Sequence, residues 1–261
     1  YYNKIRSIPD YFERRFNPGV RILATFAILG YMIGYIAIGF LTMGKTLEPL
    51  LGIDLYMIIF IVAIISGIYI TFGGQTAVIF TDLLQGFILI FAGILVFILG
   101  INYVGGFDIF WNALSPEFKL PLANFNQPSN FNFVGIFWQD GVAGSVGFLF
   151  MNQGLIMRFM ACKSVHEGRK AAAFNVLILL PICTIVVSNA GWIGKVISVV
   201  TPEAWNTATK LDHVFTQVAY LITGSEVVFA FVIAAVAAAL MSTVDTLINA
   251  VAAVVINDVY R

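Results

Sequence analysis

The sequence is poor in charged residues and in the motifs of catalysis. Asp, Glu, Lys and Arg make up 11% of the 261 residues, against about 25% in a typical soluble domain. Only two cysteines occur, Cys162 in a basic loop and Cys183 in an apolar stretch, and we expect both to be reduced. No P-loop, HExxH or GxSxG motif is present. With a net charge of +0, these absences argue against nucleic-acid binding, a metal cluster and an enzyme.

Long apolar stretches fill the chain instead. Aliphatic and aromatic residues make up 60% of it, and several stretches reach the roughly 20 residues that a helix needs to cross a bilayer. We therefore predict an all-α integral membrane protein, with six transmembrane helices in a single polytopic domain over residues 1–261. The predicted spans are about 21–43, 55–72, 77–103, 133–160, 171–200 and 226–257, with a cytoplasmic loop at 1–20 and an external segment at 201–225.

Glycine and proline mark the expected breaks between and within these spans. Gly73-Gly74 predicts a turn after the second span. Pro181 predicts a kink in the fifth span, and the sequence TPEAW at 201–205 predicts the start of a short external helix. The fourth span is rich in glycine and polar residues, which predicts a discontinuous helix that is broken near residues 144–147.

Lys and Arg residues are unevenly distributed between the two sets of loops. Ten of the 14 fall on the side that includes residues 1–21, residues 158–170 and the C-terminus. The positive-inside rule predicts that this side, with both ends of the chain, is cytoplasmic. The chain begins without Met or a signal peptide and ends directly after a span, so we interpret it as an internal piece of a longer protein.

Polar residues lie on one face of the last predicted span. Ser242, Asp245, Thr246 and Asn249 are spaced i, i+3, i+4 and i+7. A carboxylate in a hydrocarbon layer is costly unless it is paired, hydrated or bound to a cation. Hydroxyls one turn away are hard oxygen donors that suit Na⁺, so this face predicts an ion site. The alternative is that the hydroxyls bond to their own helix and Asp245 faces water.

Asp82 is a second carboxylate inside an apolar stretch. It could cap the third span, since Asp is common in a first helical turn. The alternative hypothesis is that Asp82 and Asp245 are neighbours and share a cation, with Ser242 and Thr246 completing the oxygen shell. Two close carboxylates repel each other unless a cation lies between them, so without the cation one of them should bind a proton.

The interrupted fourth span predicts a pathway through the membrane. Polar and glycine interruptions expose backbone groups, which is tolerated where they line a cavity. Asn152 and Gln153, followed by Arg158, favour such a pathway. Close packing of helices through GxxG and GxxxG spacings is the alternative.

Four segments together resemble the sodium:solute symporter family. They are IPDYFERRF at 8–16, GIYITFGGQTAVIFTDLLQGFILI at 67–90, NQGLIMRFMACKSVHEGRKAA at 152–172 and AAALMSTVDTLINAVAAVVINDVYR at 237–261. The resemblance implies a leucine-transporter-type fold of two inverted five-helix repeats, of which this chain carries the third to the eighth core helices. It implies Na⁺-coupled symport of a small organic solute by alternating access. A non-transporting sensor on the same fold and a channel-like bundle remain alternatives.

The resemblance also assigns roles to residues. In the family, the main sodium site uses a backbone carbonyl and two hydroxyl residues of the eighth core helix, and its remaining ligands lie on the first core helix. The matching residues here are Ala239, Ser242 and Thr243. Some members hold a second sodium, and the matching residues are Asp82, Ser242, Asp245 and Thr246. Asp245 departs from the usual Ser or Thr, which implies a stronger or a proton-sensitive site.

Substrate contacts are expected on the discontinuous helix. The expected residues are Ser145, Phe148, Asn152 and Gln153. Phe148 falls where an aromatic residue, usually Tyr, closes the substrate site of the sugar transporters, and it lacks the hydroxyl. Ser145 falls where one bacterial branch has a sugar-contacting Asn. A sugar is therefore doubtful as the solute, and an amino acid, a carboxylate or a vitamin stays open.

Overall fold

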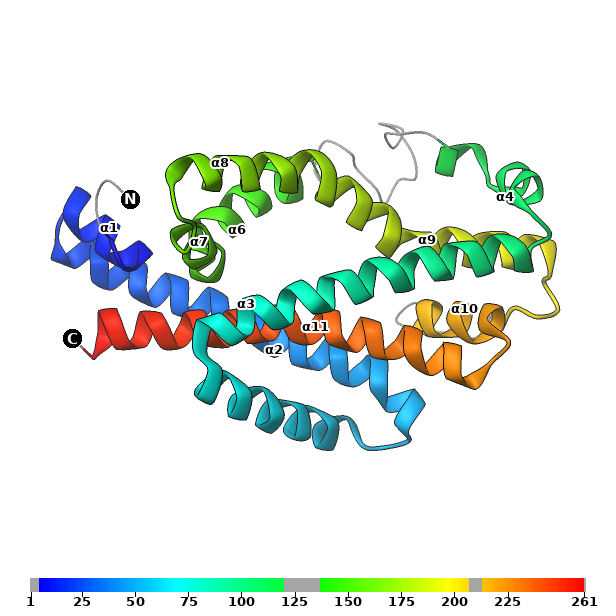
Figure 1. Ribbon diagram of the computed structural model, residues 1–261, viewed down its shortest axis with the longest axis horizontal. Helices are drawn as coiled ribbons and strands as arrows, with labels where there is room; N and C mark the ends of the chain where they lie inside the picture. The colour runs from blue at the N-terminus through cyan, green and yellow to red at the C-terminus, as the bar shows by residue number, and fades with distance from the viewer. Residues whose placement is uncertain (1–4, 120–136, 207–212, 261) are drawn as a thin grey trace.

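The structure, a computed structural model, describes residues 5–119, 137–206 and 213–260, and every element of secondary structure in these ranges is a helix (Figure 1). Four of the described helical stretches are long and apolar enough to cross a membrane: Pro18–Glu48, Leu55–Tyr103, Val165–Val200 and Glu226–Val259. Between 6% and 22% of their most apolar windows is buried inside the protein. Apolar surface on this scale fits contact with lipid, as expected of a multi-pass membrane protein.

The described helices divide into two halves along the chain. The first half contains α1 (Ile8–Arg15), α2 (Pro18–Leu51), α3 (Leu55–Tyr103), α4 (Phe107–Ala113) and the 3₁₀ turn η1 (Pro116–Lys119). The second half contains the π-helix η2 (Phe137–Gly144), α6 (Ser145–Met151), α7 (Gln153–Met160), α8 (Val165–Phe174), the π-helix η3 (Asn175–Leu179), α9 (Leu180–Val200), α10 (Val214–Thr223), α11 (Glu226–Val254) and the π-helix η5 (Val255–Val259).

A sharp reversal divides α3 at Gly74. This residue has φ 58° and ψ −155°, a conformation open only to glycine, whereas the residues on both sides are helical. We call residues 55–73 the first limb and residues 75–103 the second limb of α3. The two limbs run in nearly opposite directions in Figure 1. The turn that the Gly73-Gly74 pair predicts is therefore present, and it separates the stretches that the sequence predicts as the second and third spans.

Helix α11 lies at the centre of the molecule. It packs against α2, both limbs of α3, α7 and α10, and it runs beside α2 and the second limb (Figure 1). Val232 and Ile233 belong to an apolar cluster shared with α3, α4, α9 and α10. Leu247 and Ala250 belong to another, shared with α1 and α2. The polar residues 242–246 therefore lie on α11 between two dry clusters that fix its position.

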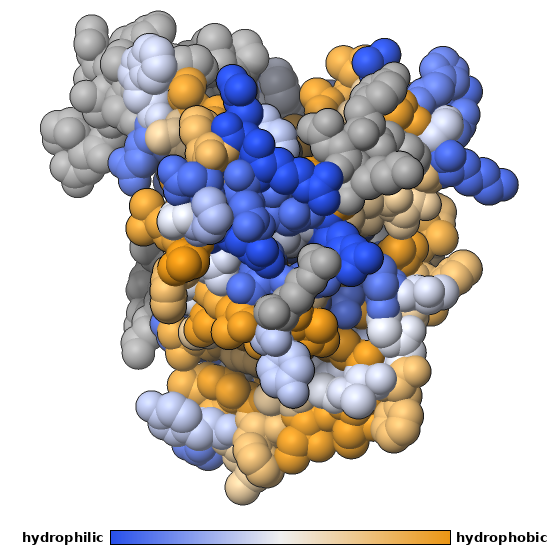
Figure 2. All heavy atoms as spheres, turned by 90° about the vertical axis from the view of Figure 1, so that its left-hand side faces the viewer, coloured by the Kyte–Doolittle hydropathy of each residue, from blue (hydrophilic) through white to orange (hydrophobic). Residues whose placement is uncertain are grey.

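Both described ends of the chain lie at one end of the molecule (Figure 1). Arg21 of α2 pairs there with Glu13 of α1 at 2.6 Å and with Asp258 of η5 at 3.0 Å. The Ser7 hydroxyl donates to Asp258 at 2.9 Å and also caps α1. Figure 2 views this end directly and shows hydrophilic residues gathered on it, with apolar surface beside and below them. This network ties the first described helix to the last.

Two local predictions need correction. The fourth predicted span is broken at Asn152, where the backbone is extended, and not near residues 144–147, because Gly144 keeps helical angles. Residues 201–205 form turns, and the short helix of this segment is α10 instead. The kink at Pro181 stays a prediction, and the helix directly before it is the π-helix η3, which fits a proline that cannot donate to the preceding turn.

A close approach between α3 and α9 depends on Gly93. A Cβ at this position would lie 2.1 Å from Val186 Cγ1 and 3.0 Å from the Val186 carbonyl oxygen. Asn189 also donates to the Gly93 carbonyl at 2.7 Å. We expect Gly93→Ala to destabilise the full-length protein by about 1–3 kcal/mol, because the helices must separate. Gly86→Ala is the control on the same helix, with nothing within 4 Å of its Cβ; equal thermal unfolding temperatures for the two variants would contradict this packing.

Candidate functional site

A carboxylate and two hydroxyls meet where α11 crosses the second limb of α3. Ser242 Oγ donates to Asp82 Oδ1 at 2.5 Å, and Thr246 Oγ1 donates to Asp82 Oδ2 at 3.1 Å. The two hydroxyls stand one helical turn apart on α11, so one carboxyl group spans both. The alternative in which these hydroxyls bond only to their own helix is therefore wrong for Ser242 and Thr246.

Asp82 does not cap a helix. It lies more than two turns past the break at Gly74, inside the second limb, and its side chain is 11% exposed. A carboxyl group at this position has no free backbone N–H of its own helix within reach. Its partners come instead from α11 and α7, so the capping alternative is wrong and Asp82 belongs to a site between helices.

Arg158 of α7 brings a positive charge to the same oxygens. Its guanidinium pairs with Asp82 Oδ2 and donates to Thr246 Oγ1. The Arg158 side chain is 40% exposed and also lines the cavity beside Thr246, so one guanidinium contacts both the cavity and the Asp82 carboxylate. The sequence marks Arg158 as part of a pathway but not as a partner of Asp82. Its lone charge in the apolar stretch MRFM was the available signal.

The local sequence explains how Arg158 reaches the site. Asn152 interrupts the helix, and its side-chain oxygen accepts from Leu155 N at 3.1 Å, which caps α7. Gly154 follows, and a Cβ there would lie 2.6 Å from Thr246 Cγ2. The glycine lets α7 begin directly against α11, and Arg158 then stands one turn further along α7.

Asp245 lies beside this cluster without joining it. Its side chain is 0% exposed, and neither carboxyl oxygen has a hydrogen-bond partner among the described residues. The Ser66 hydroxyl of the first limb lies close to this carboxyl group, but the two do not reach hydrogen-bond geometry. The alternative in which Asp245 faces a water-filled vestibule is therefore wrong. The cation that Asp82 and Asp245 would share stays a prediction.

Asn249 continues the polar face of α11 by one turn. Its side-chain amide donates to Gln75 Oε1, directly after the break at Gly74. The i, i+3, i+4, i+7 pattern of the sequence includes Asn249, whereas nothing in the pattern marks Gln75. The face of α11 thus contacts α3 at three levels, through Ser66, Gln75 and Asp82.

A cavity of about 120 Å³ opens next to the site. Its lining residues are Tyr35, Phe148, Asn152, Leu155, Arg158, Ser242, Thr243, Thr246 and Leu247. The rings of Phe148 and Tyr35 lie 6.3 Å apart between centroids, with their planes tilted by 54°. The structure thus brings Phe148 and Asn152 together with the hydroxyls of α11. Sequence reasoning missed Tyr35, which supplies a phenol to the wall where Phe148 has none.

Two of the expected substrate residues lie outside this cavity. Ser145 is exposed near the start of α6 and is not among the lining residues. Gln153 is 0% exposed and binds the start of α1 and the segment before it: its Oε1 accepts from Ile8 N at 2.9 Å, and its Nε2 donates to the Arg6 carbonyl at 3.3 Å. The Gln153 side chain therefore fixes backbone and does not face the cavity.

Besides Ser242, two residues of α11 are expected in the main sodium site, Thr243 and Ala239. Thr243 is exposed and lines the cavity beside Ser242, whereas Ala239 is half-buried one turn earlier. Ala239 can offer only its carbonyl oxygen. Ala239 lies on the same helical face as the two hydroxyl residues, but it is not among the residues that line the cavity.

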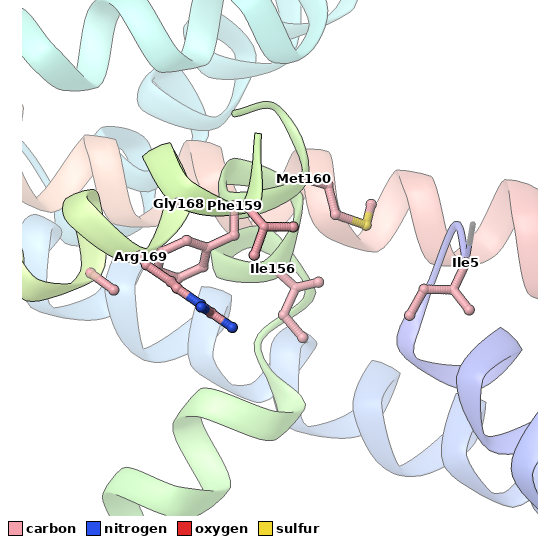
Figure 3. A pocket seen from close by; sticks show the side chains of 8 residues that line it. Ile5, Ile156, Phe159, Met160, Gly168 and Arg169 are labelled. Carbon is pink, nitrogen blue, oxygen red and sulfur yellow. The ribbon is translucent and has the colours of Figure 1, made fainter. Parts of the chain in front are cut away.

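A second, larger cavity lies apart from this site. It has a volume of about 430 Å³ and is lined mainly by apolar groups of α7, α8 and the segment before α1 (Figure 3). Phe159 and Ile156 point into it from one side, with Arg169 beside them and Ile5 opposite (Figure 3). Among the described residues, no carboxylate and no hydroxyl side chain lines it, so these residues offer no oxygen ligands of the kind that a cation needs.

The sequence is similar to those of curated membrane transporters. The sodium/glucose cotransporter of Vibrio parahaemolyticus is 28% identical over 98% of this chain and 50% of its own length. The sodium/sialic acid symporter NanT of Aliivibrio fischeri is 27% identical over 98% of this chain and 51% of its own length. The chain thus spans about half the length of these curated relatives.

The fold matches a solved structure as well. A Na⁺-coupled sialic acid symporter in a substrate-bound, outward-open state superposes with a TM-score of 0.82 at 21% identity, over 99% of this chain and 54% of that one. The profile of the sodium:solute symporter family matches residues 2–261. This family consists of transporters and not enzymes, in line with the expectation from the missing catalytic motifs. With nearly every residue covered by the profile, the chain belongs to the sodium:solute symporter family.

Proposed function

We propose that the whole protein couples the movement of Na⁺ to the uptake of a small organic solute by alternating access. One observation carries the proposal: the Asp82 carboxylate accepts hydrogen bonds from the hydroxyls of Ser242 and Thr246 inside an apolar layer. This carboxylate lies next to a helix that is broken at Asn152. Buried carboxylates are expensive in a membrane and mark ion pathways. Discontinuous helices are a recurrent device for binding near the membrane midplane.

The residues of this site fit Na⁺. A carboxylate and hydroxyl groups are hard oxygen donors, and they suit a hard cation better than a soft one. The guanidinium of Arg158 already places a positive charge against Asp82 and Thr246, so these oxygens can accept a cation there. We propose that Asp82, Ser242, Thr246 and the neighbouring Asp245 hold a second Na⁺. The main Na⁺ site would use Ala239, Ser242 and Thr243.

Coupling follows if Na⁺ binds the two states of the transporter with different affinities. The cavity beside α11 joins the expected ion residues to Phe148 and Asn152 of the broken helix. Ion binding at Ser242 and Thr243 can therefore change the wall of a solute pathway directly. The cavity volume of about 120 Å³ is below the roughly 300 Å³ of small-molecule pockets, so it suits an ion with water better than a whole solute.

The names of the relatives point to the solute class. They are described as transporters of glucose, sialic acid, monocarboxylates and proline. We propose a small organic solute of this range.

We also propose that the chain carries the third to eighth core helices as six spans. The hydrophilic end in Figure 2 is then cytoplasmic, because residues 1–21 and 158–170 are rich in Lys and Arg.

Uptake by the full-length protein in proteoliposomes tests the proposal. Radiolabelled proline, sialic acid, glucose and a monocarboxylate are offered with an inward Na⁺ gradient or an equal K⁺ gradient. We expect one of them to accumulate with Na⁺ and not with K⁺, and accumulation should rise with an inside-negative potential because each Na⁺ carries charge. Uptake that is equal with both gradients would contradict Na⁺ coupling.

Cysteine labelling tests the pathway. We expect cysteines at positions 148 and 152 of the full-length protein to react with a hydrophilic thiol reagent, because Phe148 and Asn152 line the cavity. Transported solute should slow this labelling. A cysteine at position 96 is the control, since Val96 is 1% exposed in an apolar cluster. Labelling at 148 and 152 as slow as at 96 would place the cavity out of reach of water.

A further inference from the structure

The cavity of about 430 Å³ beside α7 and α8 combines an apolar lining with a positive charge. Its apolar side chains belong to Ile5, Ile156, Phe159, Met160, Val165 and Ala172. Arg169 is the charged residue among its described lining residues, and its side chain lies beside Phe159 in Figure 3. The volume is within the roughly 300–1,000 Å³ of small-molecule pockets. The cavity can therefore hold part of a molecule that has an apolar body and a negative group.

The positive charge at this cavity is not compensated by the protein. Arg169 is exposed and makes no ion pair with any residue that the structure describes. The same holds for the side chain of Arg6, which directly follows the lining residue on the opposite side. The carboxylates nearest in sequence have their own partners, since Glu167 pairs with Lys170 at 3.1 Å and Asp10 pairs within α1. A guanidinium without a partner offers charge-assisted hydrogen bonds to a phosphate.

The cavity lies at the end of a stretch that can cross a membrane. Helix α8 is the first part of Val165–Val200, which is long and apolar enough to span a bilayer. Helix α7 and the start of α8 lie toward the end of the molecule that carries both described chain ends (Figure 1). Lipid headgroups surround such helix ends, and basic pockets between membrane helices bind the headgroups of anionic lipids.

The lining suits an acyl chain better than a peptide or a polar solute. Apart from Arg169, the described lining residues supply no charged, hydroxyl or amide side chain. An extended peptide or a polar solute would bury hydrogen-bonding groups there without partners, which is costly. An acyl chain has no such groups, and its burial against apolar side chains is favourable.

We propose that this cavity binds an anionic phospholipid of the surrounding membrane. One acyl chain lies against Ile156 and Phe159, and the phosphate accepts hydrogen bonds from the guanidinium of Arg169. The proposal goes beyond the proposed function, because lipid binding needs neither Na⁺ nor a solute. Helix α7 forms one wall of the cavity and also carries Arg158, so the lipid contacts the helix that brings a guanidinium to the candidate site.

Native mass spectrometry of the full-length protein in detergent tests the charge. Dioleoylphosphatidylglycerol and dioleoylphosphatidylcholine are titrated separately, and we expect the anionic lipid to bind more tightly. Arg169→Gln should weaken binding of the anionic lipid about fivefold, the usual contribution of one basic residue near lipid headgroups. Arg15→Gln is the control, because Arg15 is exposed at the same end but does not line the cavity. Equal binding of the two lipids, or equal weakening by the two variants, would overturn the proposal.

Filling the cavity tests the acyl-chain site independently of charge. Gly168 lines the cavity, and a Cβ there meets nothing within 4 Å. Leucine is a better helix former than glycine, so Gly168→Leu should fold. We expect it to lose the bound phosphatidylglycerol at concentrations that saturate the wild type. Gly191→Leu is the control, since Gly191 is an exposed glycine of α9 with the same free space.

A different occupant gives a different result. If another segment of the full-length chain fills the cavity, Gly168→Leu should lower the thermal unfolding temperature and leave binding of phosphatidylglycerol unchanged. That outcome would overturn the proposal, as would loss of lipid binding in Gly191→Leu to the same extent as in Gly168→Leu.

Discussion

Replacing Asp82 by asparagine should raise the Na⁺ concentration for half-maximal uptake at least tenfold, which corresponds to about 1.4 kcal/mol of lost Na⁺ binding. Asparagine keeps the shape and one acceptor for Ser242, but it removes the negative charge that now faces Arg158. A cation in an apolar layer depends on such a charge. The measurement is Na⁺ activation of uptake by the full-length protein in proteoliposomes, normalised to protein level.

Arg158→Gln should act in the opposite direction. In the structure the guanidinium occupies the oxygens of Asp82 and Thr246 that we assign to Na⁺. Removing it should lower the Na⁺ concentration for half-maximal uptake, because Asp82 then lacks a counterion. The double variant should resemble Asp82→Asn alone. Glu167→Gln serves as the control for both variants, since Glu167 is an exposed carboxylate paired with Lys170.

An unchanged Na⁺ dependence in Asp82→Asn would contradict the assignment of Asp82 as a Na⁺ ligand.

Ser242→Ala and Thr243→Ala form the second prediction. Both hydroxyls line the cavity, and Ser242 also bonds to Asp82. Loss of one hydroxyl to a charged partner costs about 1.5–3 kcal/mol, so each variant should raise the half-maximal Na⁺ concentration by about tenfold or more. The measurement is the same Na⁺ activation curve.

Thr184→Ala is the matched control for these two variants. Its hydroxyl donates to the Leu180 carbonyl of its own helix at 2.8 Å and faces outward. We expect its activation curve to match the wild type. If Ser242→Ala and Thr243→Ala also match the wild type, the hydroxyls of α11 are not Na⁺ ligands.

Glycine located the reversal within α3, whereas the break in the fourth span required more than glycine. The Gly73-Gly74 pair predicts a reversal because only glycine adopts the angles seen at Gly74. Glycines at 144–147 gave a false signal, since glycine can also stay helical, as Gly144 does. The real break occurs at Asn152, whose side chain replaces a lost backbone partner by capping α7. In this helix the capping residue marks the break, whereas Gly144 does not.

The helical spacing of Ser242, Asp245 and Thr246 identified the face of α11 but not the partner of each residue. Ser242 and Thr246 meet Asp82, as the hypothesis from the sequence required. Asp245 turns instead toward Ser66, which lies in a different limb of α3. Small differences in direction around a helix select different neighbouring helices, and only packed neighbours reveal which ones.

The sequence by itself determined that the chain is an all-helical membrane protein with buried carboxylates, because hydrophobic length, helical period and the cost of an intramembrane charge are local properties. The tertiary structure alone decided how those charges are balanced. Gly154 lets α7 approach Thr246, so Arg158 reaches Asp82. The reversal at Gly74 places one limb of α3 against each side of the polar face of α11, so Asp82 is paired, whereas Asp245 has no hydrogen-bond partner among the described residues. Charge compensation acts over a few ångströms between distant parts of the chain, and no local pattern records it.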